Sequence, residues 1–168
     1  MSAFAQYILP MTVLAAVGSG LMAGLLFAFS NFVMKALTRL PSEQGMAAMQ
    51  QINVAIINPV FLILFLGTAV LCAVLTLYAV LQRQSITTVW LLVGCGFYLV
   101  GTVGVTMAFN VPLNNALAGS KAAISVAPDV WPSYVKAWVR WNHVRALLSF
   151  AAEVSLTFAA TQVHRLTH

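Results

Sequence analysis

The sequence predicts an all-α integral membrane protein, in which residues 1–168 form a single four-helix bundle. Of its 168 residues, 61% are hydrophobic and only 7% are charged, whereas soluble proteins carry about a quarter charged residues. The mean hydropathy is +0.93. Because so few charges could not cover a helical bundle in water, the lipid bilayer is the expected surrounding.

Four apolar segments reach the ~20 residues that a helix needs to cross a bilayer. They are Tyr7–Met34, Val60–Leu81, Ile86–Phe109 and Trp138–Val163. The first is longer than required, so we expect it to tilt or to project beyond the lipid. No Lys or Arg precedes this segment, which argues against a cleavable signal peptide.

The links between the spans predict an orientation. Lys35–Gln51 and Asn110–Ala137 are long and Gln82–Ser85 is short, so both long links lie on one side. That side is the more basic one, with Lys35, Arg39, Lys121, Lys136 and Arg140 against Arg83 and Arg165. The positive-inside bias predicts cytoplasmic long links in a multi-pass protein of a bacterial inner membrane. The net charge of +5 follows from this bias, and nucleic acid is not an expected partner.

The first long link is expected to contain an interfacial helix. After Pro41, apolar residues recur at helical spacing: Met46, Met49, Ile52 and Ile56. Asn58-Pro59 then predicts a kink before the second span.

Small residues and cysteines point to packing within the bundle. Ala16, Gly20, Gly24 and Ala28 recur at every fourth residue, which lets helix backbones approach closely in lipid. The alternative use of this strip is a homodimer seam. Cys72 and Cys95 lie inside spans and are expected to be free thiols.

Uncharged polar residues gather on the side of the long links: Ser30, Asn31, Gln50, Asn53, Asn58, Asn110, Asn114, Asn115 and Asn142. Amides both donate and accept hydrogen bonds, so they could hold a ligand that carries a carbonyl or hydroxyl group. The alternative is that they cap helix ends and satisfy kinked backbone.

The segment Trp131–Glu153 carries a broad polar and aromatic stripe: Trp131, Tyr134, Trp138, Trp141, Asn142, Arg145, Ser149 and Glu153. An interfacial aromatic belt would explain the Trp and Tyr residues, but not the polar residues that continue into the membrane. The stripe therefore predicts an interior pocket with the Trp residues as its roof and Glu153 as its floor. A pair between Glu153 and Arg145, direct or through Ser149 and water, is expected.

His143 is a candidate general base, since the ordinary pKa of histidine lies near neutrality. The alternative is an interfacial residue beside Lys136 and Arg140, because helical spacing turns His143 away from Arg145. No set of His, Cys and carboxylate residues has the spacing of a metal site, and no phosphate-binding, nucleotide or haem motif is present. Neither a metal nor another cofactor is expected.

Four ordered motifs resemble those of one family. They are Phe29–Met34, Met49–Asn53, Phe109–Asn114 and Trp138–Arg145. Together they resemble the anthrone oxygenase family of small four-span membrane proteins, and the resemblance runs from about Leu14 to Ala160. It implies a monooxygenase whose fungal relatives oxidise an anthrone to an anthraquinone with molecular oxygen. Glu153 belongs to none of the four motifs.

The resemblance implies roles for particular residues. The substrate would be a flat lipophilic aromatic molecule beside Trp138 and Trp141. His143 would be the base, and Arg145 with amides from Asn110, Asn114 or Asn142 would stabilise the oxyanion, without metal or flavin. The other expected binding residues are Asn53, Asn110, Asn114, Gln50 and Glu153. Two alternatives stay open, a non-enzymatic carrier of a quinone-like molecule and an accessory membrane subunit.

Overall fold

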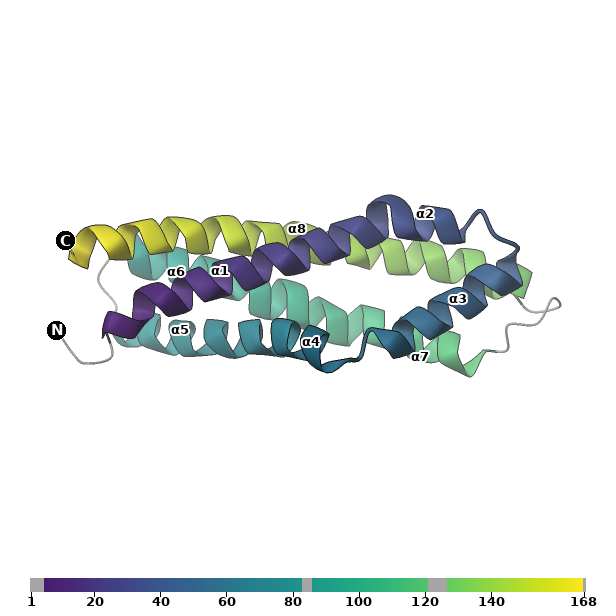
Figure 1. Cartoon of the computed structure of the whole chain (residues 1–168), viewed down its shortest axis with the longest axis horizontal. Coiled ribbons are helices and arrows are strands. Elements are labelled where there is room, and N and C mark those ends of the chain that lie inside the picture. Colours follow the sequence, from purple (N-terminus) through teal and green to yellow (C-terminus); the bar gives the residue numbers. More distant parts are fainter. Residues whose placement is uncertain (1–4, 83–85, 121–126, 168) are drawn as a thin grey trace.

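The computed structural model of the chain describes residues 5–82, 86–120 and 127–167. Within these ranges all regular structure is helical, as predicted. Figure 1 shows the helices running side by side along the long axis of the molecule. Arg83 and Lys121, two of the basic residues behind the expected orientation, lie outside the described residues.

Four stretches of helix are long and apolar enough to cross a membrane: Gln6–Leu37, Pro59–Leu81, Thr87–Gly119 and Ala127–Val163. Each contains most or all of one expected span, so the chain is an integral multi-pass membrane protein. The third and fourth helices extend further than expected into the second long link. α7 (Val111–Gly119) continues the third, and α8 (Ala127–Thr167) begins eleven residues before Trp138.

The first long link contains the expected helix, α3 (Ser42–Ala55), which follows Pro41 directly. The expected break at Asn58-Pro59 is also present. Asn58 is the N-cap of the short helix α4 (Pro59–Leu62), and its side chain accepts a hydrogen bond of 3.1 Å from the backbone N–H of Phe61. Pro59 occupies the first turn, where its missing N–H costs nothing.

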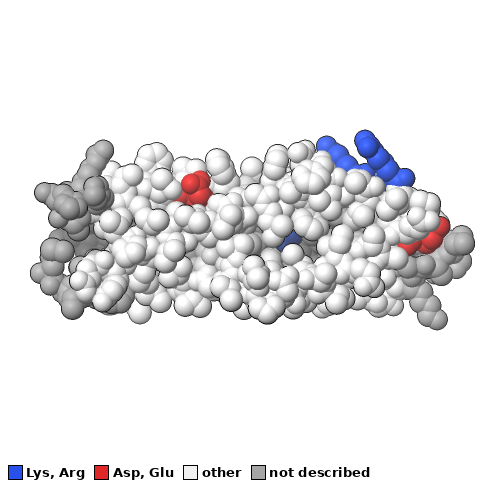
Figure 2. All heavy atoms as spheres, viewed as in Figure 1, with Lys and Arg blue, Asp and Glu red and all other residues white. Residues whose placement is uncertain are grey.

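Two apolar clusters hold the bundle together. One joins α1 (Ala5–Ala28), α5 (Thr68–Gln82), α6 (Ile86–Gly96) and the C-terminal half of α8, and includes both free cysteines. The other joins α3, α7 and the start of α8 through Met46, Met49, Leu117, Trp131 and Trp138. Figure 2 shows a face that is almost uncharged, with basic side chains mainly at the end where Figure 1 places α2 (Met34–Leu37) and α3.

Glycines allow close packing at some helix contacts but not at all of them. A Cβ at Gly101 would lie 2.6 Å from Leu148, and one at Gly94 would lie 2.8 Å from Leu156. In the predicted small-residue strip of α1, a Cβ at Gly20 would lie 3.2 Å from Glu153, whereas one at Gly24 would meet nothing within 4 Å. In this strip, Gly20 therefore lies beside the flexible side chain of Glu153, and Gly24 meets no neighbouring helix.

Several described segments are π-helical, which the sequence did not predict. They are η1 (Phe29–Val33), η2 (Ile63–Gly67), η3 (Phe97–Gly104) and η4 (Thr106–Asn110). Such segments are rare and frequently occur at functional sites, because they change which side chains share a helix face. Here η1 and η4 both contribute to the cavity described next.

Candidate functional site: a cavity around a buried arginine

Arg145 lies in the middle of α8 and is only 7% exposed. Its Nη2 donates a hydrogen bond of 2.5 Å to Asn142 Oδ1, and its Nη1 donates one of 3.2 Å to Thr106 Oγ1. The guanidinium carbon is 5.5 Å from the centre of the Trp138 ring, within the range of a cation–π contact. Within the described residues no acidic side chain is among its partners, so neutral dipoles and an aromatic ring surround this cation.

Asn142 fixes the position of the guanidinium. It is fully buried, and its Nδ2 donates hydrogen bonds of 2.6 Å to the backbone oxygen of Leu26 and to Ser30 Oγ. Its oxygen is thus left to accept from Arg145. Because Leu26 and Ser30 belong to the first span, this one amide joins the first and fourth spans at the depth of Arg145.

Two further asparagines orient the aromatic side of the site. Asn110 Nδ2 donates to the backbone oxygen of Trp138 at 3.3 Å. Asn114 Oδ1 accepts hydrogen bonds of 2.9 Å from both Tyr134 Oη and Trp138 Nε1. Both rings are therefore held in fixed orientations.

A cavity of about 160 Å³ opens between these residues and the first and second spans. Its walls are mostly apolar and come from α1, η1, α3, α4, η4, α7 and α8. The lining residues are Leu25, Leu26, Phe29, Met49, Ile52, Asn53, Ile56, Ile57, Phe61, Thr106, Asn110, Val111, Asn114, Trp138 and Arg145. The break at Asn58-Pro59 lets Ile57 and Phe61, on either side of it, face the same space.

Residues of this cavity carry most of the unsatisfied buried polar atoms. In the described part of the chain, five buried side-chain polar atoms have no hydrogen-bond partner, and three of them belong to cavity residues: Asn53 Nδ2, Asn110 Oδ1 and Arg145 Nε. Such atoms are uncommon because each costs desolvation energy without a compensating bond. Two donors and one acceptor of the residues that line the cavity are thus without a hydrogen bond.

The structure brings together five of the ten predicted site residues as cavity lining: Asn53, Asn110, Asn114, Trp138 and Arg145. Asn142 lies directly behind Arg145.

Three other predicted residues do not line this cavity. His143 is exposed on the other side of α8, as helical spacing indicated. Trp141 stacks on Phe109, with ring centres 3.6 Å apart, and so does not form the expected roof. Gln50 donates hydrogen bonds to the backbone oxygens of Leu117 and Ser120, at 2.8 and 2.9 Å, and thus caps the C-terminal end of α7.

Glu153 and Arg145 do not form the expected direct pair, and Glu153 is not the floor of this cavity. Glu153 accepts a hydrogen bond of 3.3 Å from Thr157, and the intervening Ser149 bonds to Thr102 at 2.8 Å. Eight residues of α-helix separate Arg145 from Glu153, which places them about 12 Å apart along the axis and about 80° apart around it. The two charges therefore face different neighbours.

Thr106 and the apolar wall from α1 and α4 are parts of the site that the sequence did not predict. Thr106 precedes Asn110 by four residues, so the two share a helix face, and that spacing was an available signal. Leu25 and Phe61 gave no comparable signal, since nothing distinguishes them from other apolar residues in a span. Among the described residues, no group of three or more His, Cys, Asp and Glu side chains could hold a metal ion.

A sequence model of the family described as Anthrone oxygenase matches residues 61–155, more than half of the chain. The chain belongs to this family. The matched range includes Asn110 and the Trp138–Arg145 motif, whereas the motifs at Phe29–Met34 and Met49–Asn53 lie before it. No curated protein and no solved structure matches the chain.

Proposed function

We propose that this protein is a membrane-embedded oxygenase that binds an enolisable polycyclic phenol in the Arg145 cavity and promotes its oxidation by molecular oxygen. One observation carries the proposal. A buried cation without an acidic partner in the described chain lines an apolar cavity of a membrane protein and has an unpartnered Nε. The family supports the class of reaction.

The chemistry that suits this arrangement is stabilisation of an enolate. When an anthrone-type substrate loses its activated C–H proton, negative charge develops on its carbonyl oxygen. A preorganised cation in a water-poor site stabilises such an oxyanion strongly. The electron-rich enolate then reacts with oxygen, so that a CH₂ group and O₂ become a carbonyl group and water.

The remaining polar atoms have complementary tasks in this proposal. Asn53 Nδ2 donates to a second substrate oxygen, and Asn110 Oδ1 accepts from a phenolic hydroxyl group. Trp138, Phe29 and Phe61 provide the surfaces against which a flat ring system packs. Asn142 is a positioning residue, because it acts through Arg145.

His143 stays the proposed base. Its exposed position on α8 means that it would reach the substrate only after a change in the helix. Without such a change, Arg145 would favour ionisation of the substrate by stabilising its enolate, and a water molecule would accept the proton.

The second candidate function is a non-enzymatic carrier of a lipophilic anion. One observation favours it: the residues that line the cavity include no His, Lys, Cys or acidic side chain that could move a proton. The same anion-binding geometry would then serve storage or delivery.

The orientation is also part of the proposal. The end of the molecule that carries Lys35, Arg39, Lys136 and Arg140 would face the cytoplasm of a bacterial inner membrane. Labelling single cysteines in the two long links from either side of sealed vesicles would test this.

The decisive experiment measures oxygen consumption with anthrone as the probe, using purified protein in phosphatidylcholine nanodiscs and empty nanodiscs as the blank. We expect oxidation above the blank and a loss of about 100-fold in Arg145→Gln, the magnitude typical of removing one oxyanion donor. Arg140→Gln, which removes an exposed cation from the same helix, is the matched control and should stay active. Saturable binding of anthrone without oxidation above the blank would contradict the oxygenase function and favour the carrier function.

A further inference from the structure

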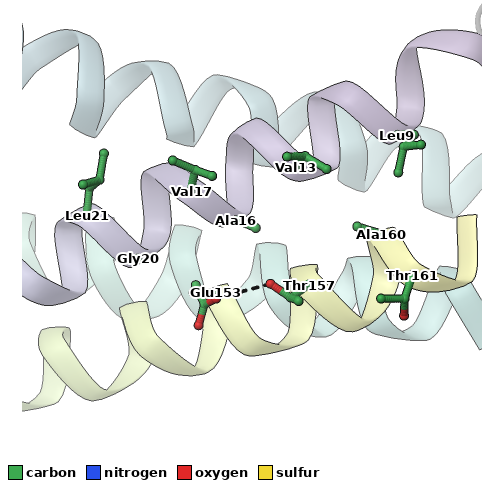
Figure 3. Close-up of a pocket in the computed structure, with 10 residues that line it drawn as sticks. All are labelled: Leu9, Val13, Ala16, Val17, Gly20, Leu21, Glu153, Thr157, Ala160 and Thr161. Carbon is green, nitrogen blue, oxygen red and sulfur yellow. Dashed lines mark hydrogen bonds between the residues drawn. The ribbon is translucent and has the colours of Figure 1, made fainter. Parts of the chain in front are cut away.

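A second hollow lies on the outer surface of the bundle, between α1 and α8. It has a volume of about 820 Å³ and is lined by Leu9, Val13, Ala16, Val17, Gly20, Leu21, Glu153, Thr157, Ala160 and Thr161. It shares no lining residue with the Arg145 cavity. Figure 3 shows the apolar side chains of α1 along one wall and Glu153, Thr157 and Thr161 along the other. We call it the Glu153 groove.

The walls of the Glu153 groove belong to two membrane-spanning helices, Gln6–Leu37 and Ala127–Val163. Val13, Val17 and Leu21 are 44%, 55% and 57% exposed, so this surface faces lipid when the protein is in a bilayer. From Leu9 to Leu21 the α1 wall is roughly 18 Å long, at 1.5 Å per residue. A linear alkyl chain of about a dozen carbons fits such a length.

Glu153 gives this apolar groove a single charged group. The two other acidic residues of the chain, Glu43 and Asp129, lie in the first turns of α3 and α8. Glu153 accepts one hydrogen bond, from Thr157 Oγ1, and within the described residues no basic side chain pairs with it. An ionised side chain among hydrocarbon is costly unless an opposite charge accompanies it, and such residues usually mark function.

We propose that the Glu153 groove is a binding site for a lipophilic amine. The ammonium group pairs with the Glu153 carboxylate and the alkyl chain lies along α1 from Leu21 towards Leu9. Charge complementarity selects this occupant. A fatty acid would bring a second negative charge to Glu153, and so would a second copy of the chain docked by a two-fold axis on the same groove.

The test uses dodecylamine, dodecanol and dodecanoate as probes that share one chain length. Each is titrated into the full-length protein in nanodiscs of neutral phosphatidylcholine, and bound molecules are counted by native mass spectrometry. We expect one dodecylamine per chain, at least 10-fold tighter than dodecanol, with dodecanoate weakest. Glu153→Gln should lower the affinity for dodecylamine to that for dodecanol.

Two further variants separate the charge from the shape of the groove. Ala160→Phe fills the groove and leaves the carboxylate in place, so it should weaken dodecylamine and dodecanol alike. Glu43→Gln removes a carboxylate outside the groove and should change neither affinity. Thermal unfolding of each variant checks the fold, and Ala160→Phe supplies an answer if Glu153→Gln does not fold.

Three results would overturn the proposal. The amine could bind equally well to wild type and Glu153→Gln, or dodecanol could bind as tightly as the amine. The third is a dimer in wild type that dissociates in Ala160→Phe and binds no amine, which would assign the groove to a second copy. Oxidation of anthrone serves as an independent readout, because the groove and the Arg145 cavity share no residue.

Discussion

The Arg145 cavity and the Glu153 groove are two ways of keeping one charge within the same membrane-spanning helix. Arg145 is 7% exposed, and two hydrogen bonds and the Trp138 ring surround it. Glu153 is half-buried, accepts one hydrogen bond and borders an open apolar groove. The first charge is held by the dipoles of the protein, and the second depends on whatever occupies the groove.

This difference separates stability from recognition. Neighbouring side chains bond to Arg145 or pack on it. Removing one of them therefore leaves a buried charge without compensation. Around Glu153 few protein contacts would be lost, so changes there should affect binding more than folding.

The largest loss of stability is expected for Asn142→Leu. The substitution removes the hydrogen bonds to Arg145, Leu26 and Ser30 and keeps the number and branching of the side-chain heavy atoms. Leaving buried polar groups unpaired costs about 1–3 kcal/mol each, so we expect the free energy of unfolding to fall by about 3 kcal/mol. Unfolding in mixed micelles would measure it, and Glu153→Gln, which alters the single bond to Thr157, should lose less than about 1 kcal/mol. Equal losses in both variants would contradict the contrast.

A smaller effect on stability is expected for substitutions at two glycines, one in a tightly packed helix contact and one beside the Glu153 groove. A Cβ at Gly101 would overlap Leu148 at 2.6 Å, whereas one at Gly20 would touch the flexible side chain of Glu153 at 3.2 Å. Gly101→Ala should cost about 1–3 kcal/mol by overpacking, and Gly20→Ala should be close to neutral. The control is Gly24→Ala, whose Cβ meets nothing within 4 Å. The comparison fails if Gly20→Ala proves the more harmful of the two.

The helix break beside the cavity predicts a loss of about 1 kcal/mol for Asn58→Ala, the typical cost of removing an N-cap side chain. The same change should also weaken ligand binding in the Arg145 cavity, since Ile57 and Phe61 lie on either side of the break. Asn115→Ala, at an exposed asparagine that does not line the cavity, is the matched control. If Asn58→Ala destabilises the protein without affecting binding of anthrone, the break does not shape the cavity.

Most of the fold could be predicted from the sequence, because a helix that crosses the bilayer must be long and apolar. Run lengths of apolar residues gave the spans, and Asn58-Pro59 gave the break before the second span. Part of the polar site could also be predicted, since Asn110 and Arg145 are unusual inside membrane helices. Their gathering in one cavity follows from the rule that such residues avoid lipid.

The sequence did not predict how each helix is rotated about its own axis, and therefore which neighbour each side chain faces. Trp141 and Asn142 are neighbours in the chain, yet one stacks on Phe109 and the other reaches Leu26 and Ser30. The π-helical segments at Phe29–Val33 and Thr106–Asn110 shift the facing of residues in a way that an ideal helical wheel omits. Glu153 was assigned to the wrong side for a related reason, because an offset of about 80° was treated as one broad stripe.

The smallest effect on stability and on ligand binding is expected for His143→Ala, and this makes the variant informative. An exposed side chain outside both the Arg145 cavity and the Glu153 groove should change the free energy of unfolding by less than about 0.5 kcal/mol. If anthrone binding and stability stay as in wild type while oxidation falls by about 100-fold or more, His143 acts as the base and α8 must turn or unwind locally during turnover. If oxidation also stays unchanged, the proton leaves through water, and stabilisation of the enolate by Arg145 is sufficient for the reaction. The two outcomes differ in kcat alone, so parallel measurement of kcat and of anthrone affinity in His143→Ala and Arg145→Gln decides between a moving helix and a fixed cavity.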